Sequence, residues 1–285
     1  MEEKTTAGGG DGWLENLIKR TLTGIPALVI LLLLIAFAHW AVLGFAVMLA
    51  GVYGVYEFRG LLAGEPGIHL PRAPLFGGAA LIGLGGLVGG APGLTITLAV
   101  SALVVMTGGL LNLKDDQLPR LRDAALTVFG LVWIPWFLGH LILVVRQPQG
   151  NGLVIFLLLV LAANDTFAYF TGSLLGRRLL LPMVSPKKTV EGAIGGIAGG
   201  VLGALVAALW LIGGDSGLSL LHLLVLGALL AAMGQAGDLL ESMVKRSAGA
   251  KDSGSFLPGH GGFLDRLDSF LLASPFLYYY HTLMV

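Results

Sequence analysis

The sequence has no cysteine and little charge: of its 285 residues only 12% are charged, whereas 55% are hydrophobic. The absence of cysteine excludes disulfides, thiolate metal sites and cysteine nucleophiles. The 17 Lys and Arg residues balance the 17 Asp and Glu residues, so there is no overall basic field to recruit nucleic acid, and we expect no nucleic-acid partner. Soluble domains carry about twice this share of charge, so the composition excludes a soluble globular protein.

Long runs of apolar residues make up most of the sequence. A bilayer core of about 30 Å needs about 20 apolar residues per helix. Runs of this kind predict an all-α integral membrane protein, a polytopic bundle of about nine transmembrane helices. The predicted spans are residues 22–38, 40–56, 74–90, 94–111, 124–145, 152–173, 190–212, 218–237 and 268–285.

The spans divide the chain into three predicted parts. Residues 1–21 form a polar N-terminal tail, residues 22–145 hold about five N-terminal spans, and residues 146–285 hold about four spans and most of the polar residues. With this count, 16 of the 17 Lys and Arg residues lie on the side of the N-terminus, and only Arg146 lies opposite. The positive-inside rule therefore predicts a multi-pass protein of the cell membrane, with a cytoplasmic N-terminus and the C-terminus outside.

Two polar positions interrupt the sixth span. Asn164 and Asp165 lie within its apolar run, where a polar or charged side chain costs a few kcal/mol and usually faces the bundle interior or water. We expect them either to form a polar wall of a substrate or ion cavity or to make an interhelical hydrogen bond that fixes packing.

The eighth span ends in a polar stripe. If its helix continues past residue 237, then Asp238, Glu241, Ser242 and Lys245 recur on one face. Two carboxylates, a hydroxyl and an ammonium group then lie side by side. The alternative is a solvated face of the helix as it leaves the membrane.

Both long loops on the predicted cytoplasmic side suit phosphate chemistry. Residues 251–268 are rich in glycine, which allows backbone amides to face an anion, and Asp265 and Asp268 follow at a spacing that suits Mg²⁺. The loop before the seventh span carries two basic pairs with a serine beside the second, which suit a phosphate group or serve only as topology signals. Those residues are Arg177, Arg178, Ser185, Lys187 and Lys188.

Taken together, embedded carboxylates, a glycine-rich turn and basic residues on one side of the membrane favour metal-assisted phosphoryl or nucleotidyl transfer on an amphiphile. Two alternatives remain open. A secondary transporter also carries embedded carboxylates at broken helices, and a CTP-dependent polyprenol kinase is chemically closer.

From residue 242 onward the chain resembles the signature of phosphatidate cytidylyltransferases, also called CDP-diacylglycerol synthases. That signature reads S-x-x-K-R-x-x-x-x-K-D followed by P-x-H-G-G-x-x-D-R-x-D. Here it is formed by Ser242, Lys245, Arg246, Lys251, Asp252, Pro258, His260, Gly261, Gly262, Asp265, Arg266 and Asp268. The segments around Asn164-Asp165 and Ser185-Pro186-Lys187-Lys188 are also similar to the family.

The resemblance implies a multi-pass enzyme that joins CTP and phosphatidic acid to give CDP-diacylglycerol and pyrophosphate, with Mg²⁺ as cofactor and a homodimer as the assembly. From the placement of the carboxylates we expect Asp238, Asp265 and Asp268 to be the metal ligands, and the predicted catalytic set adds Lys245 and His260. The substrate-binding residues implied are Asn164, Asp165, Ser185, Lys187, Lys188, Ser242, Arg246, Lys251, Asp252 and Arg266.

Overall fold

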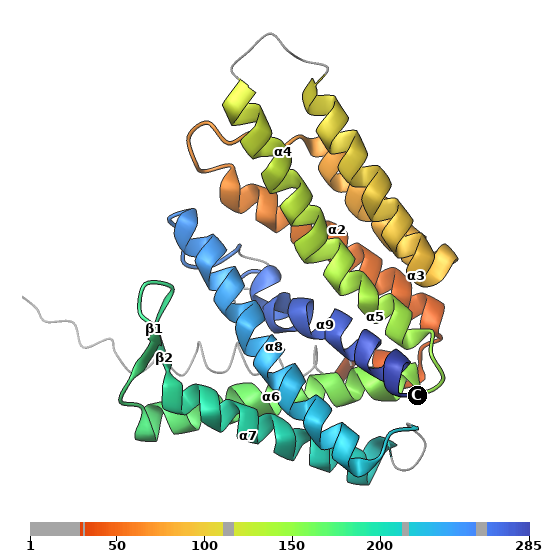
Figure 1. Ribbon diagram of the computed structural model, residues 1–285, viewed down its shortest axis with the longest axis vertical. Coiled ribbons are helices and arrows are strands. Elements are labelled where there is room, and N and C mark those ends of the chain that lie inside the picture. The colour runs from red at the N-terminus through yellow and green to blue at the C-terminus, as the bar shows by residue number, and fades with distance from the viewer. Residues whose placement is uncertain (1–28, 31, 111–116, 213–216, 255–260) are drawn as a thin grey trace, which may run out of the picture.

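The structure is a computed structural model, and it describes residues 29–30, 32–110, 117–212, 217–254 and 261–285. Within these ranges the chain forms long helices and one small β-hairpin (Figure 1). The elements are α2 (Trp40–Leu62), α3 (Arg72–Leu110), α4 (Gln117–Leu131), the π-helical turn η1 (Val132–Trp136), α5 (Phe137–Val145), α6 (Gly150–Leu175), β1 (Leu179–Leu181), β2 (Ser185–Thr189), α7 (Val190–Ala207), the π-helical turn η2 (Ala208–Ile212), α8 (Leu220–Ser247) and α9 (Leu264–Met284).

Six helical stretches in the described part of the chain are long and apolar enough to cross a membrane. The chain is therefore a multi-pass, all-α membrane protein, as the composition predicts. About half of the predicted first span lies outside the described residues, and residues 29–30 and 32–37 of it are helical. The last helix, α9, is not among the six stretches, so the count of nine spans stays a prediction.

One of the six stretches, α3, consists of two helices that fold back on each other. Its 39 residues would be about 58 Å long if straight, nearly twice a bilayer core. Gly90 breaks the helix with φ 61° and ψ −144°. Beyond the break the halves lie close together, because a Cβ atom built on Gly78 would lie 3.2 Å from the Cβ of Ser101. Two antiparallel arms result, which correspond to the predicted spans 74–90 and 94–111.

Glycines allow α7 to pack closely along α6. A Cβ atom built on Gly199 would lie 2.5 Å from the Cβ of Phe167, and one on Gly203 would lie 2.9 Å from the Cβ of Ala163. Such close helix packing through small residues is typical of membrane bundles. In Figure 1 the α6–α7 pair runs across the molecule, and α8 crosses it. The predicted division of the chain after residue 145 stays a prediction. Helices from the two predicted parts pack together, since α5 contacts α9.

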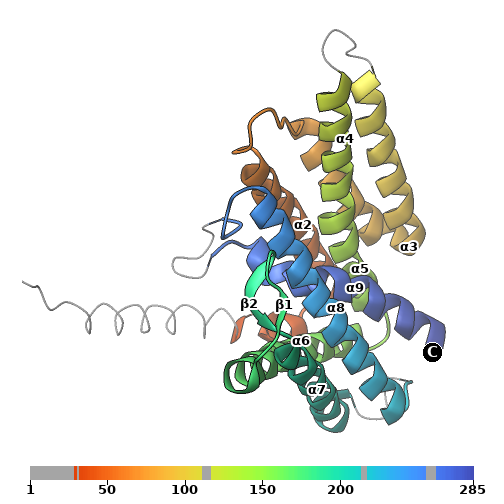
Figure 2. The same cartoon turned by 60° about the vertical axis from the view of Figure 1, so that its left-hand side comes forward.

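A β-hairpin joins α6 to α7 at the end where α8 finishes and α9 begins. It is antiparallel, with Leu181 opposite Ser185, in a stretch that the sequence indicates only as a charged loop. Thr189 at the end of β2 caps α7, since its hydroxyl accepts a hydrogen bond from the amide of Gly192 at 3.0 Å. Figure 2 shows the hairpin standing beside α8, and β2 contacts both α7 and α8. Strand β2, which carries Lys187 and Lys188, is thus held next to the part of α8 that carries Asp238.

Candidate functional site

A cavity of about 530 Å³ lies among α6, β1, β2, α7, α8 and α9. Its wall combines carboxylates, amides and lysines with small and apolar side chains. Eight of the residues predicted from the sequence to form the site line it, namely Asn164, Asp165, Ser185, Lys187, Lys188, Asp238, Asp265 and Asp268. The structure therefore brings the two predicted cytoplasmic segments together with the sixth span.

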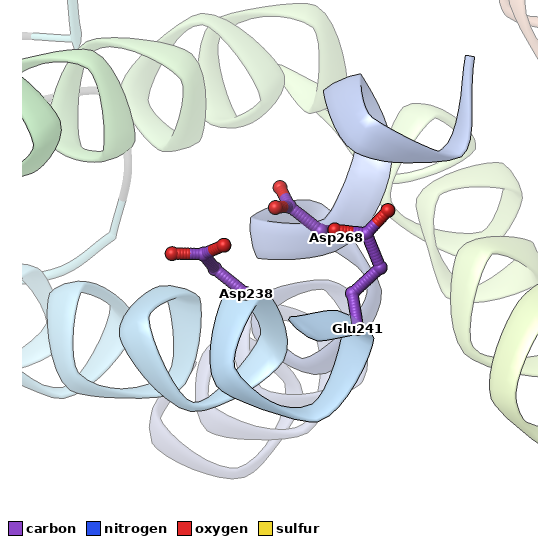
Figure 3. Close-up of side chains that lie close together, drawn as sticks. All are labelled: Asp238, Glu241 and Asp268. Carbon is purple, nitrogen blue, oxygen red and sulfur yellow. The ribbon is translucent and has the colours of Figure 1, made fainter. Parts of the chain in front are cut away.

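Three carboxylates gather between α8 and α9: Asp238, Glu241 and Asp268, hereafter the acidic triplet (Figure 3). One oxygen from each lies within 4.8 Å of the others. Glu241 is buried, and its Oε1 has no hydrogen-bond partner among the described residues. Clustered carboxylates repel one another unless a cation compensates them, and hard oxygen donors suit Mg²⁺. The donor set and the orphaned Oε1 atom therefore fit a divalent cation.

Asp265, by contrast, is engaged by donors from the protein itself. Its Oδ1 accepts from Lys245 Nζ at 2.6 Å, and its Oδ2 accepts from the amides of Ser253 at 3.1 Å and Gly262 at 2.7 Å. Burial opposes the charge of Asp265, but the neighbouring Glu241 side chain and the hydrogen bonds from Lys245, Gly262 and Ser253 outweigh it and lower the pKa of Asp265 to about 2. Asp265 is thus an anion that fixes the start of α9 and orients Lys245.

Lys245 also joins Asp265 to the acidic triplet. Its ammonium group lies 2.7 Å from Glu241 Oε2, one helical turn earlier on α8. The predicted stripe is confirmed for Asp238, Glu241 and Lys245, which all belong to this arrangement. Of the four stripe residues only Asp238 lines the cavity, and Glu241, Ser242 and Lys245 do not.

The second lysine of the hairpin faces the triplet from the opposite wall. Lys188 forms an ion pair with Asp238. Burial lowers the pKa of the Lys188 ammonium group, against the opposing effect of the Asp268 and Asp165 carboxylates. Its neighbour Lys187 lines the same cavity and is exposed. Both lysines of β2 therefore belong to the wall of the cavity.

Both interpretations of the polar positions in the sixth span are correct in part. Asn164 is buried, and its Oδ1 accepts a hydrogen bond from Gln235 Nε2 on α8 at 2.7 Å. It makes the interhelical bond, while Asp165 beside it lines the cavity and accepts from Asn164 Nδ2 at 2.9 Å. A Cβ atom on Gly196 of α7 would lie 2.7 Å from Asn164 Oδ1, so a glycine there makes room for the network.

Several predicted site residues lie away from this cavity. Arg246 donates to the carbonyl oxygen of Ala250 at 3.3 Å, at the end of α8. Lys251, Asp252 and Arg266 are exposed and do not line the cavity. His260 lies outside the described residues. Their assignment to substrate binding or catalysis stays a prediction.

The sequence interpretation left out two polar residues near the site, the half-buried Gln235 and the buried Glu57. Gln235 precedes Asp238 by three residues, so its place on the polar stripe is a signal that was available. Glu57 follows directly on an apolar run, and it is buried against the start of α9. A carboxylate at the end of a span was the only local signal for it.

The chain is similar in sequence to a known protein family and to several bacterial proteins. The chain matches the cytidylyltransferase family over residues 18–284. It is 34% identical over 264 residues to the phosphatidate cytidylyltransferase of Staphylococcus haemolyticus, which covers 90% of this chain and 96% of that protein.

Other relatives match over shorter segments. The chain is 39% identical over 155 residues to the phosphatidate cytidylyltransferase of Staphylococcus saprophyticus, or 54% of this chain and 58% of that protein. It is 42% identical over 142 residues to that of Bacillus subtilis, or 49% of this chain and 52% of that protein. In these matches the chain spans little more than half the length of the curated relatives.

Proposed function

The chain belongs to the cytidylyltransferase family, and we propose that it transfers a cytidylyl group from CTP to phosphatidic acid in phospholipid biosynthesis. The products are CDP-diacylglycerol and pyrophosphate. The observation that supports this most strongly is the cavity itself, in which Asp238 and Asp268 of the acidic triplet face Lys187 and Lys188 on β2. Such a site suits two substrates that are both polyanions.

In the proposed reaction an oxygen of the phosphatidic acid phosphate attacks the α-phosphorus of CTP. A bond forms between that oxygen and the phosphorus, and the bond from the α-phosphorus to the bridging oxygen breaks. Pyrophosphate leaves with the electron pair. Because the attacking phosphate is already an anion, no strong general base is required.

The lysines of β2 neutralise the two substrates as they approach. Without substrate Lys188 is paired with Asp238, so an incoming phosphate competes with that carboxylate for the ammonium group. Lys245 is held by Asp265 and Glu241 at 2.6 and 2.7 Å, and it supplies a fixed positive charge next to the acidic triplet. Preorganised charges of this kind stabilise the transition state without reorganising.

We also propose Mg²⁺ as the cofactor. Asp238 and Asp268 of the predicted metal set belong to the acidic triplet, and Glu241 joins them. Asp238, Glu241 and Asp268 would hold Mg²⁺ there, and the ion would offset the negative charge of the phosphate groups. Asp265, whose oxygens already accept three hydrogen bonds, supports the site from its edge in this proposal.

Radiolabelled CTP tests the reaction and separates it from the alternatives. Purified protein reconstituted in lipid vesicles is given phosphatidic acid, a polyprenol, Mg²⁺ and CTP labelled either in cytosine or at the γ-phosphate. Cytosine label in the lipid product supports cytidylyl transfer. Lipid label from the γ-phosphate alone would indicate a polyprenol-type kinase, and uptake without any labelled lipid would indicate a transporter.

The arrangement in the membrane is part of the proposal. We propose nine spans, a site that opens to the cytoplasm, an N-terminus on that side and a C-terminus outside, supported by the partition of the basic residues. We further propose a homodimer in a lipid membrane, as the family resemblance implies. The molar mass of the protein in detergent tests this assembly.

Cysteines introduced singly at Ala63 and Pro148 are expected to label from opposite sides of the membrane. Both positions are exposed, one after α2 and the other between α5 and α6, and the chain has no other cysteine. A membrane-impermeant maleimide applied to intact cells should reach Pro148→Cys and spare Ala63→Cys until the cells are lysed. Labelling of both in intact cells would contradict the topology.

Replacing Lys187 and Lys188 together with glutamine is expected to raise the KM for CTP or phosphatidic acid at least about fivefold, because two charge-assisted contacts to phosphate are lost. Steady-state kinetics on the detergent-solubilised protein measures this. The matched control is Arg177→Gln with Arg178→Gln, the other basic pair beside the hairpin, which does not line the cavity. If the Lys187/Lys188 double variant has the same KM as the Arg177/Arg178 control, then Lys187 and Lys188 do not bind substrate and serve only as topology signals.

A further inference from the structure

A buried carboxylate of the N-terminal helices holds the start of α9. Glu57 lies near the end of α2 and is only 5% exposed. Its Oε1 accepts from the amide of Phe263 at 2.9 Å, and its Oε2 accepts from the amide of Leu264 at 2.8 Å. The first amides of a helix have no partner within the helix, and the apolar side chain of Phe263 at the N-cap cannot accept a hydrogen bond. Glu57 therefore caps α9 from a helix about 200 residues earlier in the chain.

The surroundings of Glu57 are shaped to admit it. A Cβ atom on either Gly254 or Gly262 would lie 2.7 Å from an oxygen of Glu57, so a side chain at either position would displace the Glu57 carboxylate. Burying a carboxylate is unfavourable unless hydrogen bonds replace its water. Ser253 supplies the third such bond, from its Oγ to Glu57 Oε2 at 2.9 Å. Carboxylate, serine and glycines thus form one close-fitting contact between the two halves of the chain.

This contact continues without a break to the acidic triplet. Ser253, whose hydroxyl bonds Glu57, donates its amide hydrogen to Asp265 Oδ2 at 3.1 Å. Asp265 Oδ1 accepts from Lys245, and Lys245 lies 2.7 Å from Glu241. Each link is a direct hydrogen bond between buried or half-buried groups. A displacement of Glu57 therefore reaches Asp265 through a single residue.

We propose that Glu57 is a positioning residue for the transfer reaction: through Ser253 and the amides of α9 it fixes Asp265, and with it Lys245 and Glu241, in the arrangement that the reaction needs. The proposal rests on the proposed function. It makes α2, which does not line the cavity, a part of the active arrangement.

Glu57→Gln separates positioning from mere stabilisation. The amide has the same size, but it offers one acceptor oxygen and turns an NH2 group toward hydrogen-bond donors. We expect kcat to fall at least about tenfold while the KM for CTP stays within about twofold, because Lys187 and Lys188, the proposed phosphate-binding residues, lie on β2 and form no hydrogen bond or ion pair with Glu57 or Asp265 among the described residues. A role in stability alone would lower the amount of folded protein and leave the kcat of the folded fraction unchanged.

The variants Ser253→Ala and Glu57→Gln/Ser253→Ala test whether Glu57 acts on Asp265 through Ser253. If Glu57 acts through Ser253, the loss in Glu57→Gln/Ser253→Ala is expected to be much smaller than the product of the two single losses, since both changes break one network. Glu65→Gln, which changes a carboxylate in the loop after α2, is the matched control and is expected to keep the wild-type kcat. Each variant is compared as purified full-length protein with the same elution profile in detergent.

The outcomes are distinct. A wild-type protein that forms no labelled liponucleotide would overturn the proposed function. Active wild-type protein together with an unchanged kcat in Glu57→Gln, or losses that multiply fully in the double variant, would overturn the positioning role. If Glu57→Gln does not fold, Ser253→Ala decides alone: a kcat lowered about threefold supports the role, and a wild-type kcat rejects it.

Discussion

Asparagine in place of Asp265 is expected to reduce cytidylyl transfer to below about 1% of the wild-type rate, which corresponds to about 2.7 kcal/mol of lost transition-state stabilisation. The amide has one acceptor oxygen, whereas the carboxylate accepts from Lys245 on one side and from the amides of Ser253 and Gly262 on the other. One side must therefore face an NH2 group. Lys245 loses an anionic partner at 2.6 Å, and the start of α9 loses its internal clamp.

The measurement is incorporation of cytosine-labelled CTP into lipid by purified protein. Asp123→Asn is the matched control, because Asp123 lies in α4 and does not line the cavity. Its asparagine keeps an oxygen that accepts the amide hydrogen of His69, now 3.1 Å from Asp123 Oδ2. Near-normal turnover in Asp265→Asn, with the protein correctly inserted, would show that Asp265 only stabilises the helix start.

The helices were predictable because their signal is local. A span of about 20 apolar residues is needed whatever its neighbours are, and the predicted range 190–212 coincides with the helical stretch formed by α7 and η2. The turn between the arms of α3 was predictable for the same reason, since 74–90 and 94–111 are separate apolar runs. The β-hairpin was not, because its two strands have only 3 and 5 residues and no alternating pattern marks them.

The sequence predicted which residues belong to the site, but it did not predict which contacts each of them makes. The i,i+3 spacing places Asp265 and Asp268 on one face of a helix, and both line the cavity. It does not show that two backbone amides and a lysine converge on Asp265 while Asp268 joins Asp238 and Glu241. That difference depends on how α8, α9 and the glycine-rich segment meet in space.

Glu57 shows most clearly which contacts cannot be predicted from local sequence. Its partners are about 200 residues away in the chain, so no window of local sequence contains both sides of the contact. The motif residues Lys251, Asp252 and Arg266 show the opposite case. Their spacing matches the family signature, yet they lie on the surface outside the cavity. A match to the signature thus does not by itself show that a residue lines the cavity.

Neutralising any member of the acidic triplet is expected to raise the Mg²⁺ concentration needed for half-maximal activity at least about tenfold, since a hard cation loses an anionic oxygen ligand. The variants are Asp238→Asn, Glu241→Gln and Asp268→Asn. Glu241→Gln is the most informative, because Glu241 is only 1% exposed and has an oxygen without a partner among the described residues. Asp268 keeps one oxygen available, since Ser269 occupies only Oδ1.

A Mg²⁺ titration of cytidylyl transfer for each variant gives the measurement, and Asp123→Asn again serves as the control. Glu241→Gln also removes the anionic partner of Lys245 at 2.7 Å, which lowers kcat but leaves the midpoint of the titration to report on the metal. A shifted midpoint in Asp238→Asn and Asp268→Asn but not in Glu241→Gln would limit the ligands to the two aspartates. Unchanged midpoints in all three would move the metal away from α8 and α9, because no variant that removes a ligand charge leaves the affinity for a divalent cation intact.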